Sequence, residues 1–323
     1  MKKRFPILLV LLSASMVFAW AGCAGETDTS AYPRKAIQLI VSYSPGAATD
    51  TQARILAKYA NQYLGQEMVI VNRPGGGGQV GWNYFASVDP DGYTLTAYNL
   101  PHVITQPMVW ETAYQLDTFE PIVNWGWDPT VFAVRNDSPF QSLEDLLDAV
   151  RQSPGTITIG HAGKFVGQHL AILLLEQEAA VQFEDVAFNG AADALAALLG
   201  GHIQVVSGNL SDMYRQGDQI RILAIATEER HPYTPEVATF AELGYPSVIM
   251  STDRGIAAKA DTPDEVIAKL EEDLLNLLHD EDFQKEMAQA GADLLIMNRA
   301  DLLEEFKHRQ TLYSELLEKI TIR

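Results

Sequence analysis

Two loops carry the residues of this sequence whose types and spacing could do chemistry. The first runs from Tyr43 to Asp50 (YSPGAATD) and the second from Gly160 to His169 (GHAGKFVGQH), and each joins a strand-like segment to a helix-like one. The first N–H groups of a helix have no partner inside the helix, and the helix dipole adds partial positive charge there. The pattern therefore predicts two places where a carboxylate could bind.

In the first loop, a turn and a helix cap can be assigned. Pro45-Gly46 turns the chain, the small Ala47 and Ala48 leave their N–H groups accessible, and Thr49 or Asp50 can cap the helix. A carboxylate could then accept hydrogen bonds from the exposed N–H groups. An ordinary strand-to-helix turn without a ligand is the alternative interpretation.

In the second loop, His161 and Lys164 could add charge-assisted hydrogen bonds to an acid. We expect the backbone amides of both loops to hold one carboxylate and Lys164 to pair with a second one. A solvated Lys164 is the alternative, and His169, which lies inside the helix start, is expected to be structural. The residues expected to contact the ligand come from these loops and from neighbouring strand ends: Tyr43, Ser44, Gly46, Ala47, Ala48, Thr49, Asp50, Asn99, His161, Ala162, Gly163, Lys164, Val166, Gly167, Asn189, Asn209 and Asp253.

The motifs of common enzyme sites are missing from the sequence. Gly75 to Gly78 lack a Gly-Lys-Ser/Thr ending and fit no nucleotide-binding fingerprint, so we expect a flexible turn there. The seven histidines show no metal-binding spacing, the single cysteine rules out a thiolate zinc site, and no G-x-S-x-G motif is present. We therefore predict a binding protein that is not an enzyme and uses no cofactor and no metal.

Strand-like and helix-like segments alternate along the chain. Apolar, β-branched runs predict strands, and apolar residues three and four apart predict helices. The alternation predicts an α/β fold with helix-covered, mainly parallel sheets. The expected strands are 36–43, 68–71, 93–98, 156–160, 185–188, 203–207 and 220–226, and the expected helices are 49–64, 79–88, 142–150, 167–178, 191–199, 263–279, 282–290 and 300–320.

The order of these segments predicts two lobes. A second unit is expected to start near Phe132, and the long helices after Thr227 are expected to pack back on the first unit. Lobe 1 would comprise 32–131 with 228–323, and lobe 2 would comprise 132–227. The chain would then cross between the lobes twice and leave a ligand cleft between them, with strand C-termini and helix N-termini facing it.

The N-terminal segment predicts export. A cationic start and an apolar run over 7–20, too short to span a bilayer, are typical of a signal peptide. Ala21-Gly22-Cys23 resembles the end of a bacterial lipoprotein signal. We therefore expect a signal at 1–23, lipidation of Cys23 and a polar tether at 24–31. Ala19-Trp20-Ala21 also fits ordinary signal peptidase, which would leave a freely soluble periplasmic protein.

The charge balance restricts the partners. The chain has 23 basic and 42 acidic side chains, and losing Lys2, Lys3 and Arg4 with the signal would leave 20 basic ones and a net charge near −22. This argues against nucleic acid and against an anionic membrane surface. A pocket of backbone N–H groups can still be locally positive and bind an anion. We expect an extracytoplasmic monomer, at the periplasm or cell surface, that contacts the membrane only through a lipid anchor.

Taken in order, the segments closely resemble the substrate-binding receptors of tripartite tricarboxylate transporters, also called the Bug family. Each motif is weak alone, but the ordered set covers nearly the whole chain after the predicted signal. The matching segments are Tyr32-Pro33 with Lys35-Ala36-Ile37, Pro45-Gly46-Ala47-Ala48-Thr49-Asp50, Asn72-Arg73-Pro74-Gly75, Pro90-Asp91-Gly92-Tyr93-Thr94-Leu95, Gly160 to Leu170, Leu198-Leu199-Gly200-Gly201 and Asp253-Arg254-Gly255-Ile256-Ala257-Ala258.

The resemblance implies a two-lobed periplasmic-binding-protein fold that closes on a small organic carboxylate. It also implies delivery of this di-/tricarboxylate or related acid to a two-component membrane permease, with helix N-terminal loops rather than a dedicated arginine gripping the acid. The sequence departs from the family at Ala47, at Lys164 to Val166 and at Ala191, where glycine, small residues and serine are usual. A ligand-binding sensor that signals to a membrane kinase is the alternative function.

Overall fold

A mixed sheet of ten strands organises residues 32–320, the part of the chain that this computed structural model describes. The predictions of a signal, a lipidated Cys23 and a tether fall on residues 1–31 and lie outside the described residues. Within residues 32–320, no helix is both long and apolar enough to span a membrane.

The first parallel group of strands lies near the start of the described chain. β1 pairs in parallel with β2 on one side and β3 on the other, as the buried apolar runs predict. Helices join these strands, and a left-handed Gly65 ends the first of them. The elements are β1 (Ile37–Val41), α1 (Ala48–Leu64), β2 (Met68–Asn72), the 3₁₀ turn η2 (Gly76–Gly78), α2 (Gln79–Phe85), β3 (Thr94–Leu100) and α3 (His102–Val109).

A second parallel group is built in the same way. β5 pairs in parallel with β6 and with β7. Ser142 accepts a hydrogen bond from the N–H of Asp145 and caps the helix that precedes this group, and the Asp145 carboxylate completes the capping box. The elements are α4 (Leu143–Gln152), β5 (Thr158–His161), α5 (Gly167–Ala179), β6 (Glu184–Ala187), α6 (Ala191–Leu199), β7 (Val205–Asn209), α7 (Leu210–Tyr214) and β8 (Ile220–Ile225).

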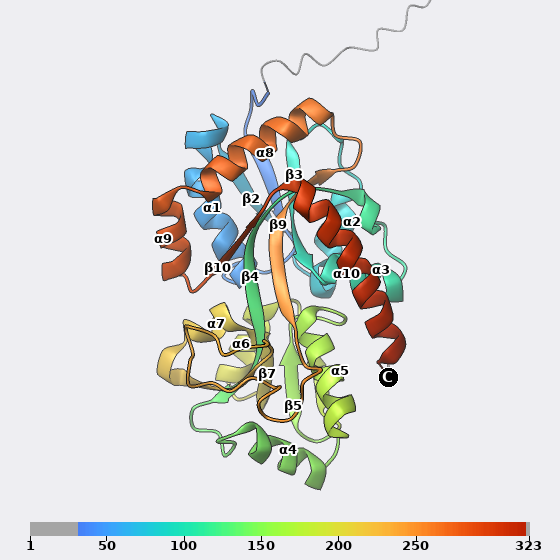
Figure 1. Cartoon of the computed structure of the whole chain (residues 1–323), viewed down its shortest axis with the longest axis vertical. Coiled ribbons are helices and arrows are strands. Elements are labelled where there is room, and N and C mark those ends of the chain that lie inside the picture. Colours follow the sequence, from blue (N-terminus) through green and yellow to red (C-terminus); the bar gives the residue numbers. More distant parts are fainter. Residues whose placement is uncertain (1–31, 321–323) are drawn as a thin grey trace, which may run out of the picture. The chain divides into compact units, whose positions relative to one another are not determined.

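Two long antiparallel strands connect the parallel groups. β4 (Phe119–Arg135) pairs along its first part with β9 (Ser251–Lys259) and along its last part with β7 and β8, while β9 also pairs with β3. Figure 1 shows β4 and β9 running beside each other. The sequence did not predict either strand, and the sheet is consequently mixed. The expected lobe boundary at 131/132 falls inside β4, so the division into lobes stays a prediction.

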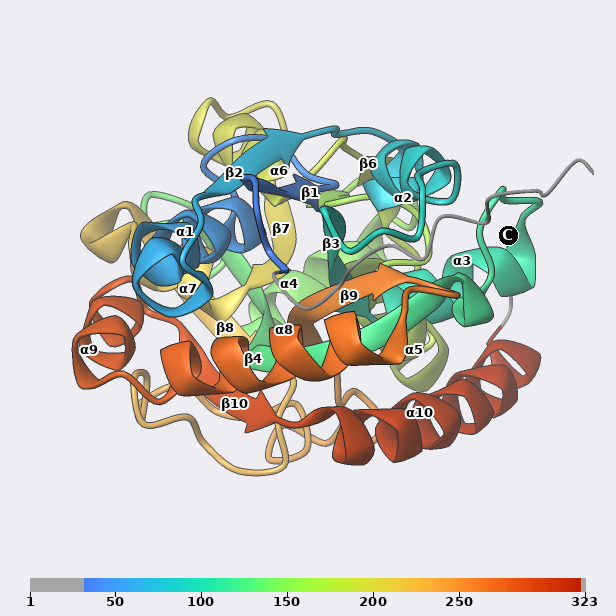
Figure 2. The same cartoon turned by 90° about the horizontal axis from the view of Figure 1, so that it is seen from above.

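The last part of the chain packs against the first group. α8 (Asp264–Leu278) contacts α1, and α10 (Arg299–Lys319) contacts α3 and β4. α9 (Glu281–Gln289) leads into β10 (Asp293–Met297), a strand that the sequence did not predict and that pairs with β4. Figure 2 shows β10 and α10 on one side of β9, with β1 and β2 on the other.

Candidate functional site

A small cavity lies where α1, α5 and α6 begin. Its volume is about 10 Å³, room for about one water molecule. An organic acid therefore fits only when the surrounding elements separate. The residues that line the cavity are Tyr43, Ala47, Ala48, Thr49, Asn99, His102, Ala162, Gln168, Ala191, Asn209, Thr252 and Arg254.

Three helix N-termini meet at this cavity. Ala48 is the first residue of α1, Gln168 the second of α5 and Ala191 the first of α6. The leading N–H groups of each helix have no intrahelical partner, and each helix end carries roughly half a positive charge. Ala162, Val166 and Ala191 pack together beside the cavity and keep its wall narrow. The arrangement suits an anion that accepts several N–H bonds.

The first loop is held by Asp50, which does not line the cavity. The Asp50 carboxylate accepts hydrogen bonds from the Gly46 N–H at 2.8 Å, from Asn72 at 2.8 Å and from Arg54 at 2.9 Å. Burial raises its pKa, but these bonds outweigh burial and the net pKa is lowered, so the carboxylate stays charged. Gly46, expected at the ligand, has therefore already donated its N–H to Asp50.

Arg254 lines the cavity and belongs to a buried ion pair. Arg254 donates from Nη1 to Asp128 at 2.8 Å and from Nε to Thr49 Oγ1 at 3.0 Å, and both charged side chains are at most 2% exposed. Asp128 also accepts bonds from the N–H and the hydroxyl of Ser211 at 3.0 and 2.5 Å. The network thus joins α1, β4, α7 and β9. The sequence prediction missed Arg254 because β9 was not expected.

Several polar atoms around the cavity have no partner among the described residues. They are Asn99 Oδ1, His102 Nδ1 and Gln168 Oε1, and each belongs to a side chain that is at most 2% exposed. Burying such an atom without a hydrogen bond costs about 1–3 kcal/mol. These three side chains therefore point to a ligand or to water at this place. Only Asn99 was expected from the sequence.

The second loop is organised by Asp185, which the sequence prediction did not single out. His161 Nε2 lies 2.8 Å and His169 Nε2 lies 3.3 Å from the carboxylate of Asp185, which also pairs with Lys164. These bonds place the charged group of Lys164 in a separate surface pocket, beside Trp110 and Asp185, and not in the cavity. The expectation that Lys164 binds a second carboxylate is therefore not supported by its position.

The same cluster has the composition of a metal site, but its hydrogen bonds do not suit one. His161, His169 and Asp185 offer ligand atoms within 4.8 Å of one another. The N–H of Phe165 donates to His169 Nδ1 at 3.0 Å, so the neutral ring carries its proton on Nε2, the atom that would face the metal. The cluster instead fixes the shape of the loop.

A glycine contact locks the second loop against the Gly75 to Gly78 turn. A Cβ added at Gly163 would lie 2.5 Å from the Cα of Gly77, so this close approach requires glycine. Gln106 donates to the carbonyls of Gly77 and Lys164, both at 3.2 Å. The Gly75 to Gly78 turn, which was expected to be flexible, is therefore held in place by α3 and by the second loop.

The remaining predicted site residues do not line the cavity, although Val166 packs beside it. Asp253 points to the opposite side of β9 from Arg254, because adjacent residues of a strand alternate, and it pairs with Arg309 at 3.1 Å. Asn189 is exposed, and Ser44 lies 3.4 Å from Asp193. The predicted residues that do line the cavity are Tyr43, Ala47, Ala48, Thr49, Asn99, Ala162 and Asn209.

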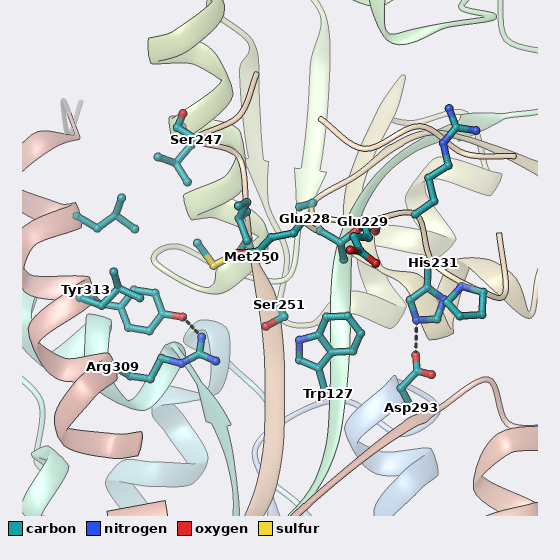
Figure 3. A pocket seen from close by; sticks show the side chains of 18 of the residues that line it. Trp127, Glu228, Glu229, His231, Ser247, Met250, Ser251, Asp293, Arg309 and Tyr313 are labelled. Atoms are coloured by element: carbon teal, nitrogen blue, oxygen red, sulfur yellow. Dashed lines mark hydrogen bonds and ion pairs between the residues drawn. The ribbon is translucent and has the colours of Figure 1, made fainter. Parts of the chain in front are cut away.

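A larger pocket of about 950 Å³ lies on the side of β9 that Asp253 faces, opposite to Arg254 (Figure 3). Trp127 and Ser251 line it, with an Arg309–Tyr313 hydrogen bond of 3.0 Å and a His231–Asp293 pair of 2.9 Å. Both arginines in its wall are already paired with carboxylates, whereas Glu228 and Glu229 are exposed. The uncompensated negative charge of this larger pocket therefore disfavours the binding of an organic acid.

We expect acid to destabilise the protein through two buried histidines. Burial, followed by the charge of Arg254, lowers the pKa of His102 to about 3, and burial lowers that of His169 to about 4. Both rings are thus neutral when folded but gain a proton near pH 6.5 when unfolded. Stability is present above pH 6.5 and falls by roughly 2 kcal/mol or more for each histidine by about pH 4.

Denaturant unfolding at pH 7.0 and 4.5 measures this loss, and the His102→Gln variant should show a shallower pH dependence than the unmodified protein. Asp185, whose pKa is lowered by its bonds to His161, His169 and Lys164 against the effect of burial, acts in the same direction. Equal stability at both pH values would contradict the account.

The position of Lys164 leads to a revised expectation for its removal. Lys164→Ala should change the affinity for mono- and dicarboxylates alike, and by less than about tenfold, because the ammonium group pairs with Asp185 outside the cavity. Calorimetric titration of both kinds of acid measures the two affinities. A loss confined to dicarboxylates would show that Lys164 reaches the ligand after all.

The strand order and the cavity at helix N-termini define an α/β solute-binding protein of the periplasmic-binding-protein fold. A solved structure described as a periplasmic transporter superposes with a TM-score of 0.84 at 28% identity, covering 90% of this chain and 98% of that one. The periplasmic binding protein BugD superposes with a TM-score of 0.83 at 27% identity, covering 89% and 98%. The fold class predicted from the sequence is confirmed.

The chain belongs to the tripartite tricarboxylate transporter family of receptors, whose family model matches residues 52–321. It is also similar to the protein BugT of Bordetella pertussis, 29% identical over 295 residues that cover 88% of this chain and 90% of BugT. The predicted resemblance is thus confirmed. Members of this family are substrate-binding receptors and not enzymes.

Proposed function

We propose that the protein captures a small organic di- or tricarboxylate, or a related acid, outside the cytoplasm and delivers it to a two-component membrane permease. Family membership supports the receptor role. The ligand class rests mainly on one observation, the meeting of three helix N-termini at a cavity that Arg254 also lines. Such an arrangement favours an anion with several acceptor oxygens.

Local donors are needed because the protein as a whole repels anions. The chain has 42 acidic and 23 basic side chains, so the long-range field opposes an approaching acid. Backbone N–H groups act over a short range, and their bonds to a carboxylate are stronger than those between neutral groups. Thr49 Oγ1 accepts from Arg254 and Asn99 at 3.0 and 3.1 Å, which leaves its own hydrogen to donate to the acid.

The proposed function requires the cavity to open and close. A cavity of about 10 Å³ holds no dicarboxylate, so the loops that enclose it must separate for the ligand to enter. β4 and β9 connect the two strand groups and are the natural place for this hinge motion. Small-angle scattering should then show a smaller radius of gyration with a bound acid than without one.

Two other proteins of this fold were solved with acids. MatC of Rhodopseudomonas palustris carries malate, with a TM-score of 0.81, and another R. palustris protein carries adipate, with a TM-score of 0.83. At 24% identity each supports the fold alone. The ligand class of this chain therefore depends on the chemistry of its own cavity.

A thermal-shift screen of the purified protein against mono-, di- and tricarboxylates tests the proposed function. A ligand that binds only the folded state stabilises it by about 2.7 kcal/mol at one hundred times Kd. We expect at least one di- or tricarboxylate to raise the unfolding temperature, with neutral sugars as the control. A screen in which sugars or amines stabilise the protein and acids do not would overturn the proposal.

Attachment to the membrane is a separate proposal. Cys23 follows Ala21-Gly22 and is the single cysteine of the chain, which supports a lipid anchor on its sulfur. Mass spectrometry of the native N-terminus should find an acylated Cys23. An unmodified terminus at Gly22 would favour ordinary signal cleavage instead.

A further inference from the structure

Two side chains of α3 hold the second loop without lining the cavity. Thr105 Oγ1 donates to the Phe165 carbonyl at 2.6 Å, and Gln106 Nε2 donates to the Lys164 carbonyl at 3.2 Å. Both α3 side chains are fully buried. α3 packs against β3 of the first group of strands, whereas the second loop joins β5 to α5 in the second group. These bonds therefore hold the two groups together on the cavity side, and they are lost when the loops that enclose the cavity separate.

The larger pocket lies behind the same hinge strands. Thr252 and Arg254 of β9 line the cavity, whereas Ser251 of β9 lines the larger pocket. β9 therefore runs between the two spaces. A rotation about β4 and β9 that separates the elements on one side brings the elements on the other side together. Opening of the cavity should consequently narrow the larger pocket.

The two walls of the larger pocket belong to different groups of strands. One wall is α10, which contacts α3 and β4. The other comes from the segment 226–250, and the N–H of Ser247 in this segment donates to Glu178 of α5 at 3.2 Å. Figure 3 shows Ser247 and Met250 of this segment together with Tyr313 of α10 around the pocket. A motion of one group against the other therefore moves the two walls relative to each other.

Each wall presents an apolar side chain that is nearly half exposed. Ile249 of the segment 226–250 is 46% exposed, Leu312 of α10 is 45% exposed, and both line the pocket. Leu174 and Leu316 add apolar surface to the same walls. Removing such surface from water is favourable in proportion to the area that is buried. Narrowing of the pocket would bury these side chains, so they favour the form in which the cavity is open.

We infer that a balance between these two surfaces, neither of which lines the cavity, sets how tightly the protein binds any acid. The bonds from Thr105 and Gln106 favour the closed form, and the apolar walls with Ile249 and Leu312 favour the open form. Because the acid is enclosed only in the closed form, its apparent affinity is proportional to the fraction of closed protein. The inference rests on the proposed function and extends it to residues away from the cavity.

Small-angle scattering without any acid tests the balance, since the closed form is the more compact one. The double variant Ile249→Thr, Leu312→Gln reduces the apolar surface of both walls, so its radius of gyration should be smaller than that of the unmodified protein. Leu243→Gln is the control, because Leu243 is 40% exposed but lies outside this pocket. It should leave the radius unchanged.

Variants of Thr105 test the other side of the balance. Thr105→Val keeps the shape of the side chain but removes the hydroxyl group that bonds to Phe165, so its radius of gyration should be larger than that of the unmodified protein. Thr105→Ser keeps the hydroxyl group and should restore the original radius. A circular dichroism spectrum shows whether each variant is folded.

Calorimetric titration with succinate, L-malate and citrate gives a second measurement. The double variant should bind each acid that the unmodified protein binds about threefold more tightly, because more of the protein is closed. Thr105→Val should bind the same acids about fivefold more weakly, since one net hydrogen bond is lost. The ratio of affinities between two acids should not change. A folding defect alone would not tighten binding.

The outcomes separate the inference from the function on which it rests. A double variant that scatters and binds like Leu243→Gln, or a gain in affinity confined to one acid, would overturn the balance and leave the acid receptor intact. Absence of binding by every acid, with stabilisation by sugars or amines in the thermal-shift screen, would overturn the proposed function. The scattering comparison without acid would still decide whether the two surfaces oppose each other.

Discussion

Replacing Arg254 by Met should destabilise the protein by about 3–5 kcal/mol and strongly weaken acid binding. The substitution leaves Asp128 as a charge that is 2% exposed and has lost its cationic partner. It also removes the bond that fixes Thr49 at the start of α1. Chemical denaturation measures the first effect, and calorimetry with the strongest acid from the screen measures the second.

Arg309→Met provides the matched control for this variant. Arg309 pairs with Asp253, which lies on the opposite side of β9 from Arg254, and the Arg309 side chain is 21% exposed. Its loss should cost less stability and leave acid binding nearly unchanged. The double variant Arg254→Met, Asp128→Leu should recover much of the lost stability, because it leaves no uncompensated charge. If the two single Met variants lose equal stability and equal affinity, Arg254 has no special role.

Replacing Ala47 by Leu should weaken all acids alike by about tenfold to a hundredfold. Ala47 precedes α1, is 3% exposed and lines the cavity. Three additional carbon atoms would occupy the space in front of the helix N–H groups, and overpacking of this kind costs about 1–3 kcal/mol. Titration with a mono- and a dicarboxylate measures whether both lose affinity together.

The control places the same substitution where no ligand is expected. Ala300 is exposed in the first turn of α10, and Ala300→Leu should leave acid binding unchanged. Unaltered binding in the Ala47 variant would show that the N-terminus of α1 does not hold the acid.

Much of the fold follows from local sequence patterns. The parallel strands and their helices were predicted because apolar, β-branched runs alternate with helical spacing, and α6 was placed at its observed bounds. β4 and β9 were not predicted because polar residues, glycine and proline interrupt their apolar sequence patterns. Pro121, Gly126 and Pro129 interrupt β4, and Thr252 to Arg254 place buried polar residues in β9. Burial of these groups depends on partners far along the chain.

The site was predicted less completely for the same reason. The small residues at the start of α1 could be recognised, because a strand-to-helix loop is a local signal. Arg254 and His102 reach the cavity only through β9 and α3, which no local pattern reveals. Gln168 lies in the second loop, which the sequence did indicate, but the residue itself was not singled out. Lys164 was assigned to the ligand because Asp185, its partner 21 residues later, could not be placed beside it.

A crystal structure of the protein with its strongest-binding acid tests the central claim most directly. The account predicts a carboxylate within hydrogen-bond distance of the first N–H groups of α1 and of α5 or α6, with Arg254 and Thr49 beside it, in a cavity enlarged from about 10 Å³. An acid bound instead in the larger pocket beside Trp127 and Arg309, with the cavity at the helix N-termini unchanged, would contradict it.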